Sequence, residues 1–272
     1  GHIYDPGIYD IQTVTVDWGD GTTETHTVDL QGSDQNPFSF SHVYVDDNPT
    51  ATPFDDYQVT VSVTDGDGGS GVNYATITVY NVAPTITGSG DEIDENGVAT
   101  IGGTIYDPGI EDTFTLTVNW GDGTVTTQTI GPGTTSWSMS HQYLDDDPSG
   151  TPSDIYAITL TITDDDTGTG SATTTVTVNN VDPLVTFDEM IQPNPEFILP
   201  IVHTLEFQAS FTDVGTLDTH TAIWDWGDGT SDSGTVIETD GSGTVTGSHV
   251  YALPGTYIVT ITVWDDDTGF DS

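Results

Sequence analysis

The sequence of 272 residues contains no lysine and no arginine, against 44 aspartate and glutamate residues, so its formal net charge is −44. Salt bridges to lysine or arginine are therefore excluded, and every acidic cluster needs bound metal, protons, backbone N–H groups or dissolved salt. Two carboxylates about 4 Å apart repel by roughly 4 kcal/mol at an effective dielectric constant of about 20. A fold is stable by only about 5–15 kcal/mol. We therefore expect an external cation to stabilise this chain, although salt adaptation would also produce an acidic composition.

The same absences exclude several partners. Without basic side chains the protein cannot contact a phosphate backbone, which excludes nucleic acid, and an anionic membrane surface would repel it. No apolar run approaches the roughly 20 residues that cross a bilayer, so we expect no direct membrane insertion. There is no cysteine, which excludes disulfides. Because calcium is abundant outside cells and scarce in the cytosol, we expect an extracellular or cell-surface location.

One short motif occurs three times. It reads V-D-W-G-D-G-T at residues 16–22, V-N-W-G-D-G-T at 118–124 and W-D-W-G-D-G-T at 224–230. A period of about 100 residues is too long for a solenoid and is typical of a chain of sandwich domains. The predicted repeats follow one another head to tail and cover residues 1–82, 83–182 and 183–272. We expect the first to be N-terminally incomplete and the third to lack its last strand.

Apolar residues and threonines alternate between the turns. In the second repeat Phe114, Leu116 and Val118 point one way, while Thr115 and Thr117 point the other. Strict alternation is typical of a strand with one buried face, and we find no convincing helical segment. The predicted fold class is all-β, with antiparallel β-sandwiches. The tryptophans on the inward phase should lie in the cores: Trp18, Trp120, Trp226, Trp224 and Trp137.

The motifs carry a family resemblance. W-G-D-G-T is followed by S-H-x-Y and then by Y-x-V-T-x-x-V-x-D, in this order and three times over nearly the whole chain. This combination resembles the polycystic-kidney-disease-type (PKD) domain. The resemblance implies seven-stranded immunoglobulin-like β-sandwiches, usually extracellular, found in adhesins and surface layers and as spacers in secreted enzymes. It also implies calcium binding at one pole in some members.

On such a sandwich the incoming linker and two loops meet at the N-terminal pole. Calcium takes six to eight oxygen ligands, and these segments supply carboxylates, amides and carbonyls without the spacing of an EF-hand. A solvated acidic surface is the alternative. The candidate ligands at this pole of the three repeats are Asp5, Asp10, Asp65 and Asp67; Asn81, Asp107, Glu111, Asp112, Asp164 and Asp166; and Asn180, Asp182, Asp213, Asp218, Asp265 and Asp267.

The opposite pole carries acidic loops after Tyr44 and Tyr143. In a head-to-tail array these loops face the next repeat, so we expect either a cation shared across the joint or a plain solvated insertion. Their carboxylates include Asp46 and Asp47 in the first repeat, and Asp145, Asp146 and Asp147 in the second, of which Asp145 and Asp147 are the favoured ligands.

Other polar motifs indicate structure rather than catalysis. Asp20, Asp122 and Asp228 lie in Gly-Asp-Gly turns, where a carboxylate accepts backbone N–H groups. The histidines of S-H-x-Y recur in the same phase in all repeats, whereas an enzyme needs one site, and no hydrolase motif is present. We therefore predict that the protein is not an enzyme.

Two functions remain open. The first is an extracellular structural or adhesive protein, a calcium-stabilised rod whose identical chains assemble head to tail into a fibre, filament or layer. Exchange of strands between chains is a more specific version of this hypothesis. The alternative is a spacer or carbohydrate-binding accessory module of a secreted hydrolase. Trp264 lies on the outward phase near Phe270, so this pair could contact polysaccharide or another subunit, or be a harmless surface feature.

Overall fold

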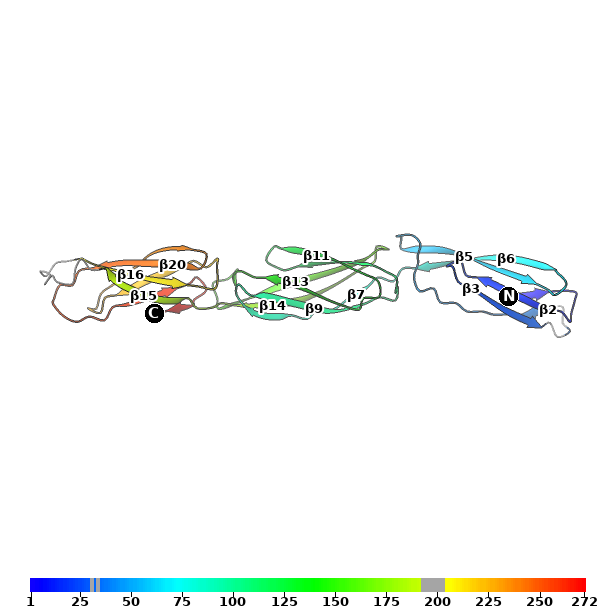
Figure 1. Cartoon of the computed structure of the whole chain (residues 1–272), viewed down its shortest axis with the longest axis horizontal. Helices are drawn as coiled ribbons and strands as arrows, with labels where there is room; N and C mark the ends of the chain where they lie inside the picture. The colour runs from blue at the N-terminus through cyan, green and yellow to red at the C-terminus, as the bar shows by residue number, and fades with distance from the viewer. Residues whose placement is uncertain (30–31, 33–34, 192–203) are drawn as a thin grey trace.

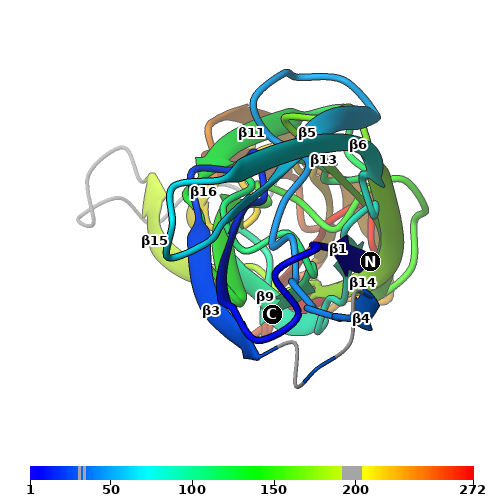
Figure 2. The same ribbon diagram turned by 90° about the vertical axis from the view of Figure 1, so that its right-hand side faces the viewer.

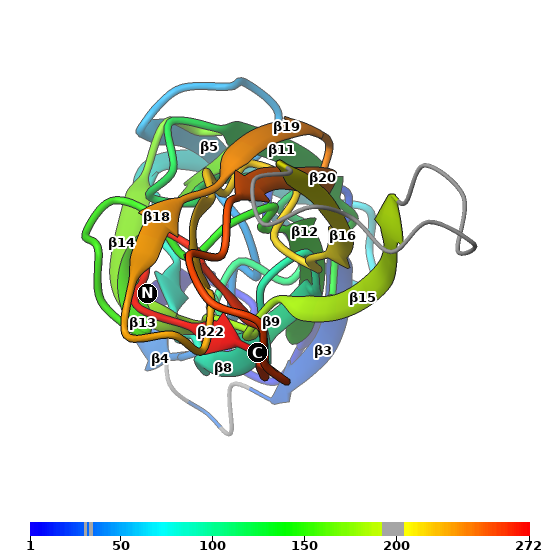
Figure 3. The same cartoon turned by 90° about the vertical axis from the view of Figure 1, so that its left-hand side faces the viewer.

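The computed structural model describes residues 1–29, 32, 35–191 and 204–272, which form three β-units in a row along one long axis (Figure 1). Views along this axis show the three units overlapping in projection (Figures 2 and 3). The described residues contain strands and no helix, and therefore no helix that could cross a membrane. The all-β prediction is confirmed.

The second repeat is built from two facing sheets. Its strands are β7 (Thr85–Ile86), β8 (Asp91–Asp94), β9 (Val98–Tyr106), β10 (Phe114–Asn119), β11 (Val125–Ile130), β12 (Ser136–Gln142), β13 (Ser153–Asp164) and β14 (Thr169–Asn179). One sheet has the order β11-β10-β13-β14-β8 and the other the order β12-β9-β7. All pairings are antiparallel except that of β8 with β14, which is parallel.

The first and third repeats follow the same plan. The first has β1 (His2–Tyr4), β2 (Ile11–Asp17), β3 (Thr23–Asp29), β4 (Gln35–Pro37), β5 (Phe54–Thr64) and β6 (Ser70–Tyr80), in sheets β3-β2-β5-β6 and β1-β4. The third has β15 (Leu184–Ile191), β16 (Leu205–Thr212), β17 (Thr221–Asp225), β18 (Ser231–Ser233), β19 (Thr235–Thr239), β20 (Ser242–His249), β21 (Thr260–Trp264) and β22 (Phe270–Asp271), in sheets β15-β16-β20-β19 and β18-β17-β21-β22.

The inward phase of the strands makes a separate core in each repeat. In the second repeat Leu116 and Trp120 are fully buried. In the third, Trp224 and Trp226 are fully buried and stack with their ring centroids 5.6 Å apart. Trp18 is only partly buried and packs against the smaller core of the first repeat. The core positions predicted from the alternation are therefore confirmed, with Trp18 the least enclosed.

The repeated W-G-D-G-T motif forms a turn held by side chains. In the second repeat Asp122 accepts hydrogen bonds from the backbone N–H and hydroxyl of Thr124 at 2.8 and 2.7 Å. Its other oxygen is 2.6 Å from Nε2 of His141, whose ring stacks on Trp120 with the centroids 4.9 Å apart. The same contacts recur in the other repeats. The aspartates and histidines of these motifs therefore have the structural contacts that the sequence predicted.

Gly121 in this turn should not tolerate a side chain. Its φ of +86° suits glycine, and an added Cβ would lie 2.9 Å from the carbonyl oxygen of Ala157. We expect Gly121→Ala to lower the free energy of unfolding by about 1–3 kcal/mol. Gly131→Ala is the matched control because nothing lies within 4 Å of its Cβ position, so its effect should stay within about 0.5 kcal/mol. Urea unfolding measures both, and equal curves would contradict the expectation.

Candidate metal centres

The acidic residues at the poles continue the buried faces of the strands. In β13 Leu160 and Ile162 face the core, and the next residue on that face is Asp164. Just before β10, Asp112 lies on the same face as Phe114 and is only 1 % exposed. Because side chains alternate along a strand, both carboxylates lie at the end of the core rather than on the outer surface.

These carboxylates meet the neighbouring repeat at the first joint, between repeats one and two. Asp107, Asp112 and Asp164 each offer an oxygen within 4.8 Å of the others. Asp46, from the loop between β4 and β5 of the first repeat, forms a second such group with Asp112 and Asp166. The first joint therefore contains two acidic triads that share Asp112, and one triad includes residues of both repeats.

Several oxygens at the first joint are buried without a hydrogen-bond partner. Both carboxylate oxygens of Asp112 are of this kind, and so is one oxygen of Asp47. Asp107 accepts a hydrogen bond from the N–H of Gly109 at 2.8 Å through one oxygen, but its other oxygen has no partner. A buried charge without a partner costs several kcal/mol, and buried charges are normally paired or bound to metal. These free oxygens therefore fit a bound cation.

The second joint, between repeats two and three, repeats this arrangement with different residues. Glu95, Asp145 and Asp146 of the second repeat form one triad, with oxygens within 4.8 Å of one another. Glu95 also forms a triad with Asp213 and Asp218 of the third repeat. The two triads share Glu95, and again one of them spans the joint.

Carboxylate oxygens that are buried without a hydrogen-bond partner also occur at the second joint. Asp146 is 0 % and Asp218 6 % exposed, and all four of their carboxylate oxygens lack a hydrogen-bond partner. Glu95 is 1 % exposed; one of its oxygens accepts a hydrogen bond from the N–H of Val181 at 2.7 Å, and the other has no partner. Each joint therefore contains several buried carboxylate oxygens without a hydrogen-bond partner, close to one another.

An asparagine connects the repeats at each joint. The N–H of Asn81 donates to the carbonyl of Pro53 in the first repeat at 3.1 Å, and its side chain donates to Asp164 in the second at 2.9 Å. At the second joint the side chain of Asn180 donates to Asp265 at 3.0 Å, and its side-chain oxygen is buried without a partner. The linkers are thus tied to Asp164, the last residue of β13, and to Asp265, the residue that follows β21.

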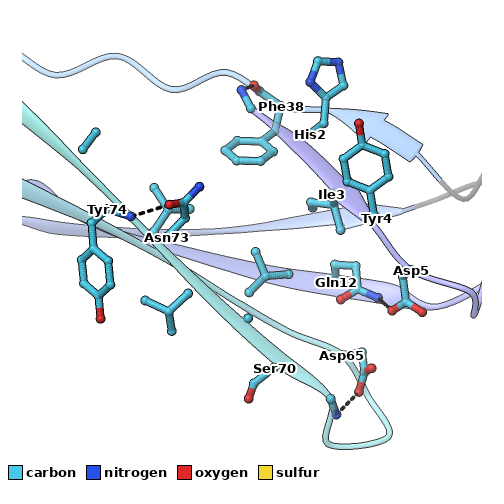
Figure 4. A pocket seen from close by; sticks show the side chains of 17 residues that line it. His2, Ile3, Tyr4, Asp5, Gln12, Phe38, Asp65, Ser70, Asn73 and Tyr74 are labelled. Atoms are coloured by element: carbon cyan, nitrogen blue, oxygen red, sulfur yellow. Dashed lines mark hydrogen bonds between the residues drawn. The ribbon is translucent and has the colours of Figure 1, made fainter.

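The N-terminal pole of the first repeat has a looser acidic group. Asp5, Asp10 and Asp65 offer oxygens within 4.8 Å of one another, but all three residues are partly exposed. Gln12 donates its side-chain N–H to Asp5 at 2.7 Å (Figure 4). This group resembles the other triads in composition but is less enclosed.

Burial and crowding raise the pKa of the carboxyls at the joints. Burial, followed by the charges of neighbours such as Asp46, raises the pKa of Asp112 to about 8. Burial and nearby carboxylates likewise raise the pKa of Glu95 to about 9, although the Val181 N–H opposes this, and that of Asp218 to about 8. These carboxyls would hold protons near neutral pH unless a cation balanced their charge.

The third repeat also matches a known family. Residues 194–272 match the PKD domain family. The first two repeats carry the same turn motif and the same S-H-x-Y motif, on the same sandwich plan. The match thus covers the third repeat, and the first two share its motifs and its plan.

Three solved structures are similar to this chain. A tetra-tandem repeat from the extending region of a large adhesion protein is 18 % identical, with a TM-score of 0.47; the match covers 97 % of this chain and 65 % of that one, just under two thirds of its length. The PKD domain of an M14-like peptidase from Thermoplasmatales archaeon SCGC AB-540-F20 is 22 % identical, with a TM-score of 0.26 and coverage of 36 % and 91 %. A tandem pair of titin immunoglobulin domains is 13 % identical, with a TM-score of 0.30 and coverage of 69 % and 91 %. No curated protein matches the sequence.

The structure brings most of the predicted ligands of the PKD-type domains together. Those found in the triads are Asp5, Asp10, Asp65, Asp107, Asp112, Asp145, Asp164, Asp166, Asp213 and Asp218. Asn81, Asn180 and Asp265 are joined to the same regions by the hydrogen bonds above, and the buried Asp267 lies near Asp145. Four other predicted ligands are exposed instead: Asp67, Glu111, Asp147 and Asp182. Metal binding by any of these residues stays a prediction.

Sequence reasoning missed Glu95 and preferred Asp147 to its buried neighbour Asp146. A signal for Glu95 does exist, because Asp91 and Ile93 of β8, four and two residues earlier, lie on the same partly buried phase. No comparable pattern marks Asp146, which lies in a loop between β12 and β13. Asp46 and Asp47 of the first repeat lie in the equivalent loop, and their place at the joint follows only from how consecutive domains pack.

Trp264 is less exposed than its outward phase predicted. Its residue is partly buried, and its ring lies beside that of Phe270 with the centroids 6.4 Å apart. Phe270 itself is 56 % exposed. The pair is therefore an exposed edge rather than a flat aromatic platform.

The raised pKa values predict an unusual pH dependence without calcium. A carboxyl whose pKa is higher in the folded state keeps its proton while the unfolded chain loses it, so stability falls as pH rises from about 4 towards about 9. With chelator present we therefore expect a higher melting temperature at pH 5 than at pH 8. Saturating calcium should flatten or reverse the trend, because protons and the ion compete for the same oxygens. The pKa of Asp112, raised to about 8, places part of this effect at the first joint.

Histidines as a class also change charge between pH 5 and 8, so a variant is needed to separate the contribution of the carboxyls. Asp112→Asn removes one titrating carboxyl and should weaken the pH dependence measured by calorimetry in chelator. A metal-free protein that melts lower at pH 5 than at pH 8 would contradict the assignment.

Proposed function

We propose that the chain is an extracellular structural or adhesive module, a rod of PKD-type domains whose joints are stabilised by calcium. The supporting observation is the burial of partnerless carboxylates at both joints, in a chain without lysine or arginine. All the donor atoms are oxygens, which favours hard cations such as calcium over softer transition metals. Calcium bound there would balance the buried carboxylates that have no partner, such as Asp112, Asp146 and Asp218.

The joints are also suited to a stiff connection. Apart from the linker asparagines, the N–H of Thr216 in the third repeat donates to the carbonyl of Leu144 in the second at 3.3 Å. The linkers are short and contain proline (Pro84 and Pro183), so they resemble spacers more than flexible tethers. A calcium-bound rod of this kind would hold its ends far apart, which is the mechanical task of a fibre or adhesin stalk.

Assembly of identical chains is part of the proposal. Strand β6 is exposed along nearly its whole length, and unpaired edge strands accept further strands. A cavity of about 610 Å³ lies beside β6 and is lined by Ile3, Phe38, Val61 and Val63, among others (Figure 4). The alternative, a carbohydrate-binding accessory module, has weaker support because Trp264 is partly buried.

Calcium should raise the melting temperature of the protein, and chelator should lower it. Ions that bind only the folded form stabilise it by about 2.7 kcal/mol per site at 100 times the dissociation constant. Scanning calorimetry with millimolar calcium chloride, against sodium chloride at the same ionic strength, measures the effect. If sodium produced the same rise, charge screening would explain the acidity and the proposed sites would be wrong.

A further inference from the structure

We propose that each joint binds two cations bridged by one shared carboxylate, and that one ion of each pair is held by residues of both neighbouring domains. The inference rests on the proposed function in taking calcium as the ion. It goes further in stating the number of ions, the bridging residues and the contribution of the upstream domain.

At the first joint the bridging residue is Asp112. It belongs to the triad with Asp107 and Asp164 and also to the triad with Asp46 and Asp166. Its two oxygens are both buried and both without partners, so each can face a different ion. Oxygens on opposite sides of one calcium ion lie about 4.6–5.2 Å apart, given Ca–O distances of 2.3–2.6 Å. The oxygens of each triad lie within 4.8 Å of one another and thus match one ion per triad.

At the second joint the bridging residue is Glu95, on the upstream side. It belongs to a triad with Asp145 and Asp146 and to a triad with Asp213 and Asp218. Its free oxygen and the free oxygens of Asp146 and Asp218 are all buried. The two joints therefore use the same plan, with the bridge contributed by the downstream domain in one and by the upstream domain in the other.

Charge also favours two ions over one. The two triads of each joint contain five different carboxylates. One divalent ion would leave three negative charges unbalanced within a few ångströms of one another, whereas two ions leave one. The remaining charge is small enough for the hydrogen bonds from Gly109 or Val181 to offset.

The upstream carboxylate links ion binding to the orientation of the domains. At the first joint Asp46 is the upstream member of its triad, while Asp107, Asp112 and Asp164 all belong to the downstream domain. Removing the charge of Asp46 should therefore release one ion and loosen the joint, yet leave the other ion bound.

The test counts bound calcium in the full chain by equilibrium dialysis with elemental analysis, at free calcium near the wild-type dissociation constant. At this concentration each wild-type site is about half occupied, and a site that binds at least about tenfold more weakly is nearly empty. Asp46→Asn should therefore lose most of the occupancy of one site and Glu95→Gln that of two, and calorimetric titration should show the same loss of affinity at those sites. Asp17→Asn and Glu92→Gln are the matched controls. Asn119 occupies the position of Asp17 in the second repeat, and Glu92 is exposed on the strand just before Glu95. Both controls should bind as many ions as the wild type.

The outcomes separate this inference from the proposed function. A wild-type chain that binds no calcium would overturn both. A wild-type chain that binds calcium, with Asp46→Asn and Glu95→Gln binding the same number at the same affinity, would leave the proposed function intact and overturn the bridged pairs. Folding of the variants is checked in chelator, where each should melt no lower than the wild type because the amide has the size of the carboxyl and adds no charge.

Discussion

The structure depends on how buried carboxylates are balanced in a chain that has no lysine and no arginine. Each joint places five carboxylates in overlapping triads, several of them with no exposed surface and no hydrogen-bond partner. Proteins usually balance such groups with arginine or lysine, or leave them in water. Apart from His220, which contacts Asp213, protons or cations from the solvent must do so here, which makes the connection between domains depend on the medium. The sandwiches themselves have apolar cores and do not share this dependence directly.

The same period of two explains both the cores and the joints. Along β13 and β21, apolar residues occupy the inward positions. At the end of each strand the next inward position is taken by an aspartate, Asp164 or Asp265. The apolar residues fix the register of these strands, and that register buries the carboxylates. A shift by one residue would expose the core and move the aspartates out of the joint, so packing of the core and geometry of the site cannot vary independently.

This register also explains how far the sequence could predict the structure. Three motif copies and the alternation were sufficient for the repeat plan, the all-β class and the buried tryptophans. They also placed Asp107, Asp112 and Asp164 at one pole, because those residues belong to one domain. Glu95 was missed, and the burial of Asp47 and Asp146 within their loops was not predicted, because it comes from contact between domains, which a periodic pattern within one domain does not encode. Asp147 was favoured over Asp146 for the same reason: in a loop, neighbouring residues carry the same charge and only packing decides which one is enclosed.

The three domains differ in how much they need their neighbours. The second has a large continuous core, whereas among the described residues of the first the buried members of the core cluster are Ile3, Val14, Val16 and Val59. A small core contributes less to stability, at roughly 25 cal/mol per Å² of apolar surface buried. An interaction formed only between folded domains adds its free energy to both of them. Cations at the first joint would therefore add to the stability of both domains that they connect, and the same ions would stiffen the rod.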